Sequence, residues 1–412
     1  MFSTEKLWFS SLVWLMLMLP TAQADEWKIS GTLEQSVEYD DNIGLNEDAT
    51  PAIGYLLNPI FLAEWNTDNM SVGLTGSGDI RRYDVKIWDC ETFSMGFNQQ
   101  YQQRSHVLSI NGGYTQSCSR TDQFSDTGIL AADNQSETYN ISPAWSWQWS
   151  ALDQLSLTSS YSKTTYSSTD SNNNIGANVS NFQGNETYRI SLSENHLWTR
   201  RLSSTLSGFY SYTKFGDSVS SSIQKVFGFQ LANHYDITRK WTIDVGGGLN
   251  WVDTPSNNSL ISNGNDSLLR TESINLALNY SGQLFNYSVN YSRTVNPSAS
   301  GQVTEFNSAN MNFSYKINRK LTFNINGNYS KNQTVGQEDN QTSIDRTFYT
   351  SSIRLIWDFA KQWKLSTSYR YRRQKLNNTG FTQVINTQAG VIDSNALIIN
   401  LNYNWDGLRV FH

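Results

Sequence analysis

The sequence predicts an all-β protein, a transmembrane antiparallel up-and-down β-barrel of about 18 strands. Three observations predict this fold. Apolar and polar residues alternate along nearly the whole chain, the links between alternating segments are short and long in turn, and aromatic residues recur near segment ends. The pattern also allows 16 to 20 strands, because a few segments alternate weakly.

The stretch over residues 395–405, which contains the last predicted strand, shows the alternation best. Leu397, Ile399 and Leu401 fall on one parity, whereas Asn400 and Asn402 fall on the other. Since a strand points successive side chains to opposite faces, one face of this segment is apolar and the other carries amides. In a barrel the apolar face contacts lipid and the polar face lines the interior, so the pattern predicts a channel.

The first 24 residues resemble an export signal. Lys6 provides a positive charge, Leu7 to Leu19 form an uncharged apolar run, and Ala22-Gln23-Ala24 provides a small-residue cleavage site. The alternative is an N-terminal membrane anchor, but the run is too short for a helical span of ~20 residues. We therefore expect a signal peptide over 1–24 and one barrel domain over 25–412, without a transmembrane helix.

Counting alternating residues places the strands in order along the chain. The expected ranges are 27–40, 53–65, 70–82, 93–101, 106–115, 139–149, 155–165, 188–196, 202–212, 227–235, 241–251, 274–280, 285–291, 309–317, 321–329, 347–357, 363–371 and 397–405. Eight short links alternate with nine long ones. Outer-membrane barrels have short periplasmic turns and longer extracellular loops, so this alternation predicts periplasmic termini and nine outside loops in the bacterial outer membrane.

Aromatic residues and prolines refine the strand assignments. Rings near strand ends are typical of interfacial girdles, although ordinary packing would explain any single one; they are Trp65, Trp149, Trp241, Trp251, Trp357, Trp363, Tyr371 and Trp405. Pro59 and Pro143 fall inside predicted strands. Because proline cannot donate a hydrogen bond to the sheet, we expect bulges or early strand ends there.

The inward-facing parity contains the candidate pore-lining residues. Most are neutral amides and hydroxyls, which exchange hydrogen bonds with water or sugar hydroxyls at low net cost. A strongly ion-selective pore would instead show rings of charge. The candidates are Asn312, Asn324, Asn326, Asn400 and Asn402, with the charged residues Glu34, Glu38, Asp79, Arg81, Arg354, Lys364, Arg370 and Arg372.

The charged candidates are segregated along the chain. The acidic candidates and Arg81 lie on the first and third predicted strands. The other basic candidates lie on the sixteenth and seventeenth strands, except Arg372, which follows just after the seventeenth. Barrel closure would bring the two groups together. They could pair to rigidify the wall, or they could create a transverse field that contacts a charged solute.

Two cysteines and four histidines are the other chemically distinctive residues. Cys90 and Cys118 fall in the second and third predicted outside loops, and an even pair in an exported protein favours a disulfide. The histidines lack metal-ligand spacing, and His196 and His234 lack a partner motif for hydrolysis. We therefore predict no catalytic site, metal or cofactor. The net charge of −6, spread along the chain, argues against nucleic-acid binding.

The segment from Glu34 to Ile43, Glu-Gln-Ser-Val-Glu-Tyr-Asp-Asp-Asn-Ile, resembles the opening of the β-barrel porin 2 family, in which an acidic strand ends in Tyr-Asp-Asp-Asn. The resemblance implies an outer-membrane passage for an exopolysaccharide or capsular polymer, delivered by a periplasmic polysaccharide-export protein. It supplies no catalytic residues. The tail after Trp405 departs from the usual terminal aromatic, a role that Trp405 or Phe411 could fill.

Three functions fit these observations. The first is a polysaccharide export channel, the second a general or sugar uptake porin, and the third a surface barrel that transports nothing. The expected partners are outer-membrane lipid and lipopolysaccharide, the barrel-assembly machinery, the polysaccharide and a periplasmic export protein. Dependence of secreted polymer on the gene would separate the first function from the others.

Overall fold

The computed structural model describes residues 26–45, 47, 49–118, 134–168, 184–216, 222–253, 268–297, 303–334, 345–376 and 390–411. The expected signal peptide, residues 1–24, lies outside these described residues. Within them, the only helix is the three-residue 3-10 turn η1 (Lys86–Trp88), so no described helix is long and apolar enough to cross a membrane.

Eighteen strands make up the described structure, which confirms the predicted all-β class and strand number. They are β1 (Glu26–Asp40), β2 (Ala52–Asn66), β3 (Met70–Tyr83), β4 (Cys90–Gln103), β5 (His106–Cys118), β6 (Asn134–Gln148), β7 (Asp153–Ser168), β8 (Asn185–Thr199), β9 (Leu202–Phe215), β10 (Ser222–Asp236), β11 (Trp241–Asp253), β12 (Leu269–Ser281), β13 (Phe285–Pro297), β14 (Val303–Lys316), β15 (Leu321–Thr334), β16 (Asp345–Ala360), β17 (Trp363–Leu376) and β18 (Val391–Phe411).

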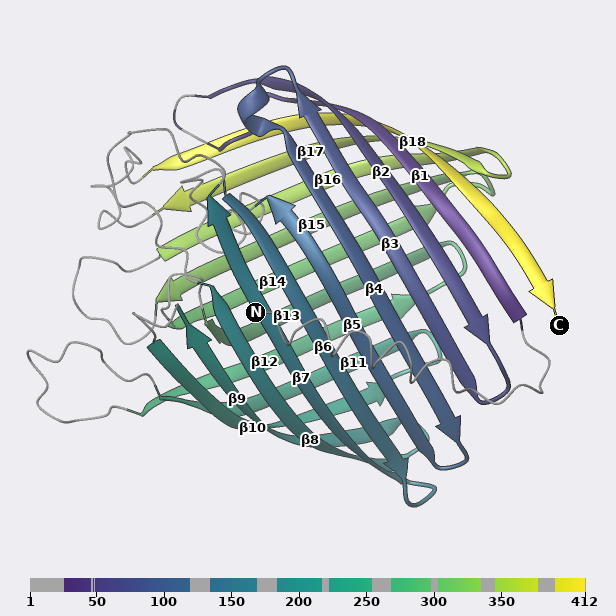
Figure 1. Cartoon of the computed structure of the whole chain (residues 1–412), viewed down its shortest axis with the longest axis vertical. Helices are drawn as coiled ribbons and strands as arrows, with labels where there is room; N and C mark the ends of the chain where they lie inside the picture. The colour runs from purple at the N-terminus through teal and green to yellow at the C-terminus, as the bar shows by residue number, and fades with distance from the viewer. Residues whose placement is uncertain are drawn as a thin grey trace, which may run out of the picture.

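The strands close into one antiparallel barrel. Each strand pairs with its neighbours in sequence, and β1 pairs with both β2 and β18. In Figure 1 the purple and blue strands form the near wall, the green strands form the far wall, and yellow β18 runs beside purple β1. Closure leaves no sheet edge, so every strand has a hydrogen-bonding partner on both sides.

The two ends of the barrel differ in the length of their connections. Eight turns of two to four residues join strands at the end where β1 begins and β18 finishes, which we name the turn end. The nine connections at the opposite end, the loop end, are five to sixteen residues long. The predicted alternation of short and long links is therefore confirmed, and the two terminal strands begin and finish at the same end.

Side-chain exposure shows which face of the wall points outward. On β1 the apolar Val37 and Tyr39 are 51% and 50% exposed, whereas Ser36, Glu38 and Asp40 between and beside them are 7%, 3% and 0% exposed. Large exposed hydrophobic side chains follow the same alternation on the other strands, for example on β18. The outer face is thus an apolar belt, and the polar rows point into the barrel.

The two prolines disturb the sheet less than expected. Around Pro59 the β2–β3 register continues unchanged from Leu57↔Ile80 to Ile60↔Ser77, and only the intervening pairs are lost. Pro143 likewise interrupts the β6–β7 pairing without shifting its register. The prediction of bulges or early strand ends at these positions is wrong, because the neighbouring pairs on both sides hold the register.

A bulge occurs instead at the closure of β1 on β18. The register shifts between Ile29↔Leu408 and Gly31↔Trp405, so β18 contains one extra residue there. Gly407 has a φ of +84°, and a Cβ atom on it would lie 1.5 Å from the Ile29 carbonyl oxygen. Only glycine fits this position. The bulge lets β18 run on to Phe411, six residues beyond the predicted end at Trp405.

Aromatic side chains gather near the strand ends as predicted. At the turn end Trp27 stacks on Trp65 with ring centroids 5.9 Å apart, and Trp363 packs against Tyr403 at 4.8 Å. Near the loop end Trp251 stacks on the ring of Phe227, at 5.4 Å. These positions bracket the apolar belt, as interfacial girdles do.

Candidate functional site

All thirteen predicted pore-lining residues lie on inward-facing rows of the wall. The register places Asn312 opposite Asn326, Asn324 opposite Arg354, and Lys364 opposite Asn402. Each of these positions alternates with outward hydrophobic neighbours such as Met311 and Ile353, which are 42% and 48% exposed. The others are Glu34, Glu38, Asp79, Arg81, Arg370, Arg372 and Asn400.

Amides and hydroxyls form ladders across the inner wall. The Nδ2 atom of Asn312 donates to Ser288 Oγ at 3.3 Å, and that of Asn326 donates to Ser352 Oγ at 3.4 Å. Asn328 donates in the same way to Asn310. An amide that makes one such bond keeps further donor and acceptor capacity for water or a solute hydroxyl.

Strand β2 is an exception to this polar lining. Its register with β1 puts Leu56, Ile60 and Leu62 on the inward parity, and Ile60 is 37% exposed. The sequence showed apolar residues on both parities here. The structure therefore adds an apolar strip to an inner wall that is otherwise dominated by amides and hydroxyls.

Inward side chains near the loop end are buried, whereas those nearer the middle of the wall are accessible. Asn312 and Asn328 are exposed in mid-wall. By contrast, the inward residues toward the loop end contact other protein atoms and are at most 9% exposed; they include Gln224, Asn250, Thr271, Ser273, Thr304, Ser308, Asn332, Arg346 and Gln374. The accessible part of the inner wall therefore lies between these buried residues and the turn end.

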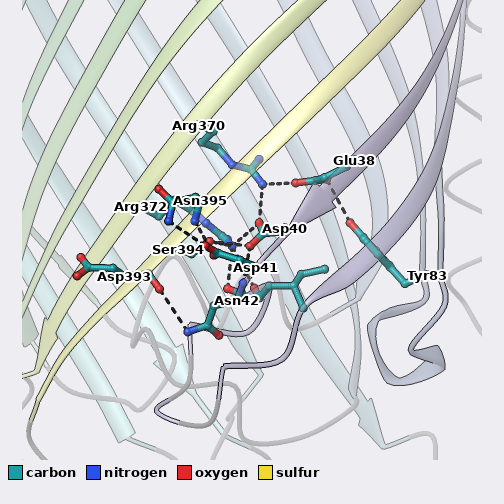
Figure 2. Close-up of polar contacts among 11 residues, drawn as sticks. Glu38, Asp40, Asp41, Asn42, Tyr83, Arg370, Arg372, Asp393, Ser394 and Asn395 are labelled. Carbon is teal, nitrogen blue, oxygen red and sulfur yellow. Dashed lines mark hydrogen bonds and ion pairs between the residues drawn. The ribbon is translucent and has the colours of Figure 1, made fainter.

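Five residues form a buried ionic cluster where the barrel closes; we name it the closure cluster. Arg370 and Arg372 of β17 reach across β18 to Glu38 and Asp40 of β1 (Figure 2). Asp40 Oδ2 accepts from Arg372 at 2.7 Å and from Arg370 at 3.2 Å, and its Oδ1 accepts from Ser394 Oγ at 2.6 Å. Arg370 also donates to Glu38.

The intervening residue of β18 explains how this contact is made. Ala396 pairs with both Arg370 and Asp40 and is 2% exposed. Its methyl group leaves room for the arginine to pass over β18. The side chain of Asp40 is 0% exposed and that of Glu38 is 4% exposed, so neither carboxylate is presented to a solute in the lumen.

The residues after Asp40 extend the closure. Asp41 accepts from the backbone and the side-chain amide of Asn395 at 2.7 and 2.8 Å, and Asn42 Nδ2 donates to the Asp393 carbonyl at 3.3 Å (Figure 2). The backbone N–H of Asn42 also donates to Asp40 at 3.1 Å. The segment Tyr39 to Asn42 thus attaches the end of β1 to β18.

Tyr83 approaches the closure cluster from the opposite side. Its hydroxyl lies 3.4 Å from Glu38 Oε2, although β2 separates the two strands. Gly54 is the β2 residue that pairs with both, and a Cβ atom on Gly54 would lie 2.2 Å from the Tyr83 ring. Glycine is therefore required for the ring to cross β2.

The remaining charged candidates do not join this cluster. Arg81 binds Asp79 on its own strand, with Nη2 and Oδ2 2.7 Å apart. Glu34 accepts from Asn400, and Lys364 lies 3.8 Å from Asp358 near the turn end. The predicted meeting of acidic and basic groups at the closure is thus confirmed for Glu38, Arg370 and Arg372 only.

Sequence reasoning identified Glu38, Arg370 and Arg372 but missed Asp40, Asp41, Tyr83, Ser394 and Asn395. Asp40 shares the inward parity of Glu34 and Glu38, which was a usable signal. Asn395 fell in the predicted link before the last strand. The cross-strand distances that unite these residues depend on register, which parity alone does not define.

Cys90 and Cys118 are bonded to each other, with Cα atoms 5.9 Å apart, as predicted. Their location differs from the expectation, because Cys90 is the first residue of β4 and Cys118 is the last residue of β5. The disulfide therefore fastens the loop end of one hairpin rather than two loops.

Two histidines have carboxylate partners that the sequence did not indicate. His196 Nδ1 lies 2.5 Å from Asp153, and His234 Nδ1 lies 2.6 Å from Asp244. Ser150 donates to Asp153 rather than to the imidazole, so these three groups are not arranged for attack by serine. Among the described residues, no group of His, Cys, Asp and Glu could hold a metal ion.

The closed wall, apolar belt and polar inner rows define the fold of an outer-membrane β-barrel. No protein-family model matches the chain, and a search of curated proteins finds no match. Among solved structures, the FrpB iron transporter of Neisseria meningitidis is similar over 91% of this chain and 81% of its own, with 6% identity and a TM-score of 0.50.

Two further structures are similar at lower scores. The siderophore receptor PirA of Acinetobacter baumannii aligns over 92% of this chain and 80% of its own, with 9% identity and a TM-score of 0.49. The ferric-catecholate import receptor Fiu of E. coli K12 aligns over 94% and 82%, with 8% identity and a TM-score of 0.44. At these identities the likeness concerns the fold alone.

Proposed function

We propose that this chain is an outer-membrane channel that exports a polysaccharide through a neutral polar lumen. The observation that carries the proposal is the set of inward Asn, Ser and Thr ladders, of which Asn312 and Asn328 are exposed on the inner wall. Neutral amides exchange hydrogen bonds with sugar hydroxyls in many equivalent places, which suits a polymer that must keep moving.

The pairing of charge supports a neutral solute. Glu38, Asp40, Arg370 and Arg372 neutralise one another in the closure cluster, and Asp79 is paired with Arg81. These groups are thus engaged with the wall rather than arranged as a ring of one sign, which an ion-selective pore would need. This favours rigidification of the wall over a transverse field.

The remaining features of the proposal concern location and partners. In this proposal the loop end faces outward and both termini are periplasmic, as in outer-membrane barrels generally. The resemblance of residues 34–43 to the β-barrel porin 2 family supports a periplasmic polysaccharide-export protein as the donor of the polymer. Lipopolysaccharide and the barrel-assembly machinery are the expected membrane partners.

Lumen substitutions test the proposal. Because binding is spread over many weak contacts, Asn312→Ala, Asn326→Ala or Asn402→Ala should change polymer export only slightly. The double substitution Asn326→Arg with Asn402→Arg should impair export strongly while leaving assembly intact. The measurements are secreted polysaccharide per cell and heat-modifiable migration of the folded barrel.

The matched controls place the same charge on the outer face. Ile325→Arg or Leu401→Arg should reduce assembly, because an arginine at the lipid midplane costs ~2–4 kcal/mol. If deleting the whole chain leaves secreted polysaccharide unchanged, export is wrong. Sugar uptake by liposomes containing the protein would then favour an uptake porin, and its absence would favour a surface barrel without transport.

A further inference from the structure

A hollow of about 840 Å³ lies on the outer face of strands β13 to β17. Twelve of its fifteen lining residues have outward parity and three, Asn310, Asn328 and Thr350, have inward parity, so the hollow opens mainly toward lipid. Small residues leave the sheet uncovered here: Gly327 pairs with Ser351, and Ala309 lies in the next outward row, opposite Tyr329. A Cβ atom on Gly327 would have nothing within 4 Å.

The strand register arranges the lining in rows that change character toward the loop end. Gly327 pairs with Ser351, and the next outward row toward the loop end pairs Tyr329 with Tyr349, whose rings are 5.1 Å apart. The row beyond it pairs Lys331 with Thr347, and Thr347 pairs in turn with Lys375. Val289 and Met311 continue the row of Gly327 toward β13 and give that part of the hollow an apolar surface.

Three cations therefore stand above an apolar hollow. Lys331 and Lys375 flank Thr347 two strand spacings apart, roughly 10 Å. Arg373 belongs to the tyrosine row, and its Nε atom lies 3.8 Å from the Asp393 carboxylate, which also accepts from Tyr371. Asp345 lies one row beyond the lysines. The cations thus exceed the carboxylates by one.

Several outward cations near this end have acidic partners, although Lys214 and Arg270 have none within 4.0 Å among the described residues. Lys163 lies 3.1 Å from Glu186, Lys225 lies 3.9 Å from Asp253, and Arg293 binds Glu305. Lys331 and Lys375 likewise have no carboxylate within 4.0 Å in the described part of the chain, and unlike Lys214 and Arg270 they line the hollow. Two such cations beside a lipid-facing hollow are complementary to an anionic head group with an attached hydrocarbon chain.

We propose that this hollow binds a phosphorylated, multiply acylated glycolipid of the outer leaflet. Its phosphates contact Lys331, Arg373 and Lys375, and one acyl chain lies over Gly327 toward Met311. The inference rests on the loop end facing outward, as in the proposed function. A free phosphate would use the cations alone, whereas the glycolipid also fills the apolar hollow immediately below them.

The test measures lipid binding by the purified barrel in detergent, using native mass spectrometry. The probes are lipid A with two phosphates, its dephosphorylated form and inorganic phosphate. We expect one molecule of bisphosphorylated lipid A to bind to each barrel. Replacing all three cations, K331Q with R373Q and K375Q, should weaken it about a hundredfold, since each cation near an anionic lipid contributes roughly fivefold.

Matched variants separate the site from general surface charge and from misfolding. K163Q with K225Q removes two cations with acidic partners on the same face and should leave binding unchanged. G327F fills the hollow while keeping the cations, so it should weaken lipid A binding without changing the response to inorganic phosphate. Heat-modifiable migration checks that each variant is folded.

Several results would overturn the inference. They are unchanged lipid A binding in the triple variant, equal binding of dephosphorylated lipid A, or competition by inorganic phosphate at the concentration of the lipid. A loop end that faces the periplasm in labelling experiments would also overturn it. Export failure is distinguishable, because lipid binding by purified protein does not depend on whether polysaccharide moves through the lumen.

Discussion

Asp40 shows how a single buried carboxylate can define where the barrel closes. It accepts hydrogen bonds from two arginines of β17, from Ser394 of β18 and from the backbone of Asn42. Burying charge is costly, and pairing repays that cost only when the geometry is good. The cluster therefore acts chiefly to specify the β1–β18 partnership, because any other partner would leave its charges unpaired.

Asp40→Asn should destabilise the folded barrel by about 3–5 kcal/mol, because it leaves the arginines without their shared negative partner. The side chain of Arg372 is only 13% exposed, so water cannot replace the lost carboxylate. Urea unfolding of the barrel in lipid vesicles measures the change in the free energy of unfolding.

Asp253→Asn is the matched control. Asp253 also lies near the loop end, but its side chain is 37% exposed and 3.9 Å from Lys225. Solvent screening limits such a pair to below about 1 kcal/mol. Equal effects of the two substitutions would contradict the special role of Asp40.

Gly54→Ala should displace the Tyr83 ring and destabilise the barrel by about 1–3 kcal/mol, as overpacking does. The added Cβ atom would lie 2.2 Å from that ring. Gly76→Ala is the control, because a Cβ atom there meets nothing within 4 Å. The measurement compares the free energies of unfolding of the two variants. If Gly54→Ala is as stable as Gly76→Ala, the Tyr83 ring can move without destabilising the barrel.

At the scale of the element, two features define each strand: the alternation of its own residues and its pairing with the strands on both sides. Parity alone identified all eighteen strands, including β2, whose apolar residues occupy both faces. The neighbours then override local breakers: β2 and β6 continue through Pro59 and Pro143 because the adjoining pairs keep their register. Local propensity is therefore a weaker constraint here than pairing on two sides.

The β4–β5 hairpin should lose stability when its disulfide is removed. Cys90 and Cys118 close a loop with a sequence separation of 28 residues. The double variant Cys90→Ser with Cys118→Ser should lower the free energy of unfolding by about 2–4 kcal/mol, because the unfolded chain regains freedom. Peptide mapping under non-reducing conditions should recover the two cysteine peptides joined. Free thiols on both would refute the pairing.

At the scale of the whole molecule, alternation of apolar and polar residues gives the barrel a lipid-facing surface, an inner wall and two rims. The outward rows are apolar, the inward rows are polar, and the two ends differ in connection length. Within the described residues, one closed sheet of alternating strands therefore forms the lipid-facing surface, the lumen and the rims.

Protease applied to intact cells should cut only in the long connections. Residues 377–389 lie in one such connection, whereas the turn containing Asn318 and Lys320 lies at the opposite end. Fragment masses after digestion identify the cleavage sites. The same digestion after disruption of the outer membrane is the control. Cleavage between Asn318 and Lys320 in intact cells would reverse the proposed orientation.

The sequence by itself determined the β-barrel class, a strand number close to eighteen and the inward parity of the thirteen candidates, and it favoured the pairing of the two cysteines. Each depends on a period of two or on spacing along the chain, which are local properties. The approach of the acidic first strand to the basic seventeenth also followed, because closure of a barrel leaves only the last strand between them.

Only the tertiary structure decided which partners these residues have. The bulge at Gly407, the passage of Tyr83 over Gly54 and the union of Asp40 with Arg372 depend on the register between strands. The hollow over Gly327 likewise depends on which small residues of neighbouring strands lie side by side. Parity cannot supply this information, because a shift of two residues preserves every face while changing every neighbour.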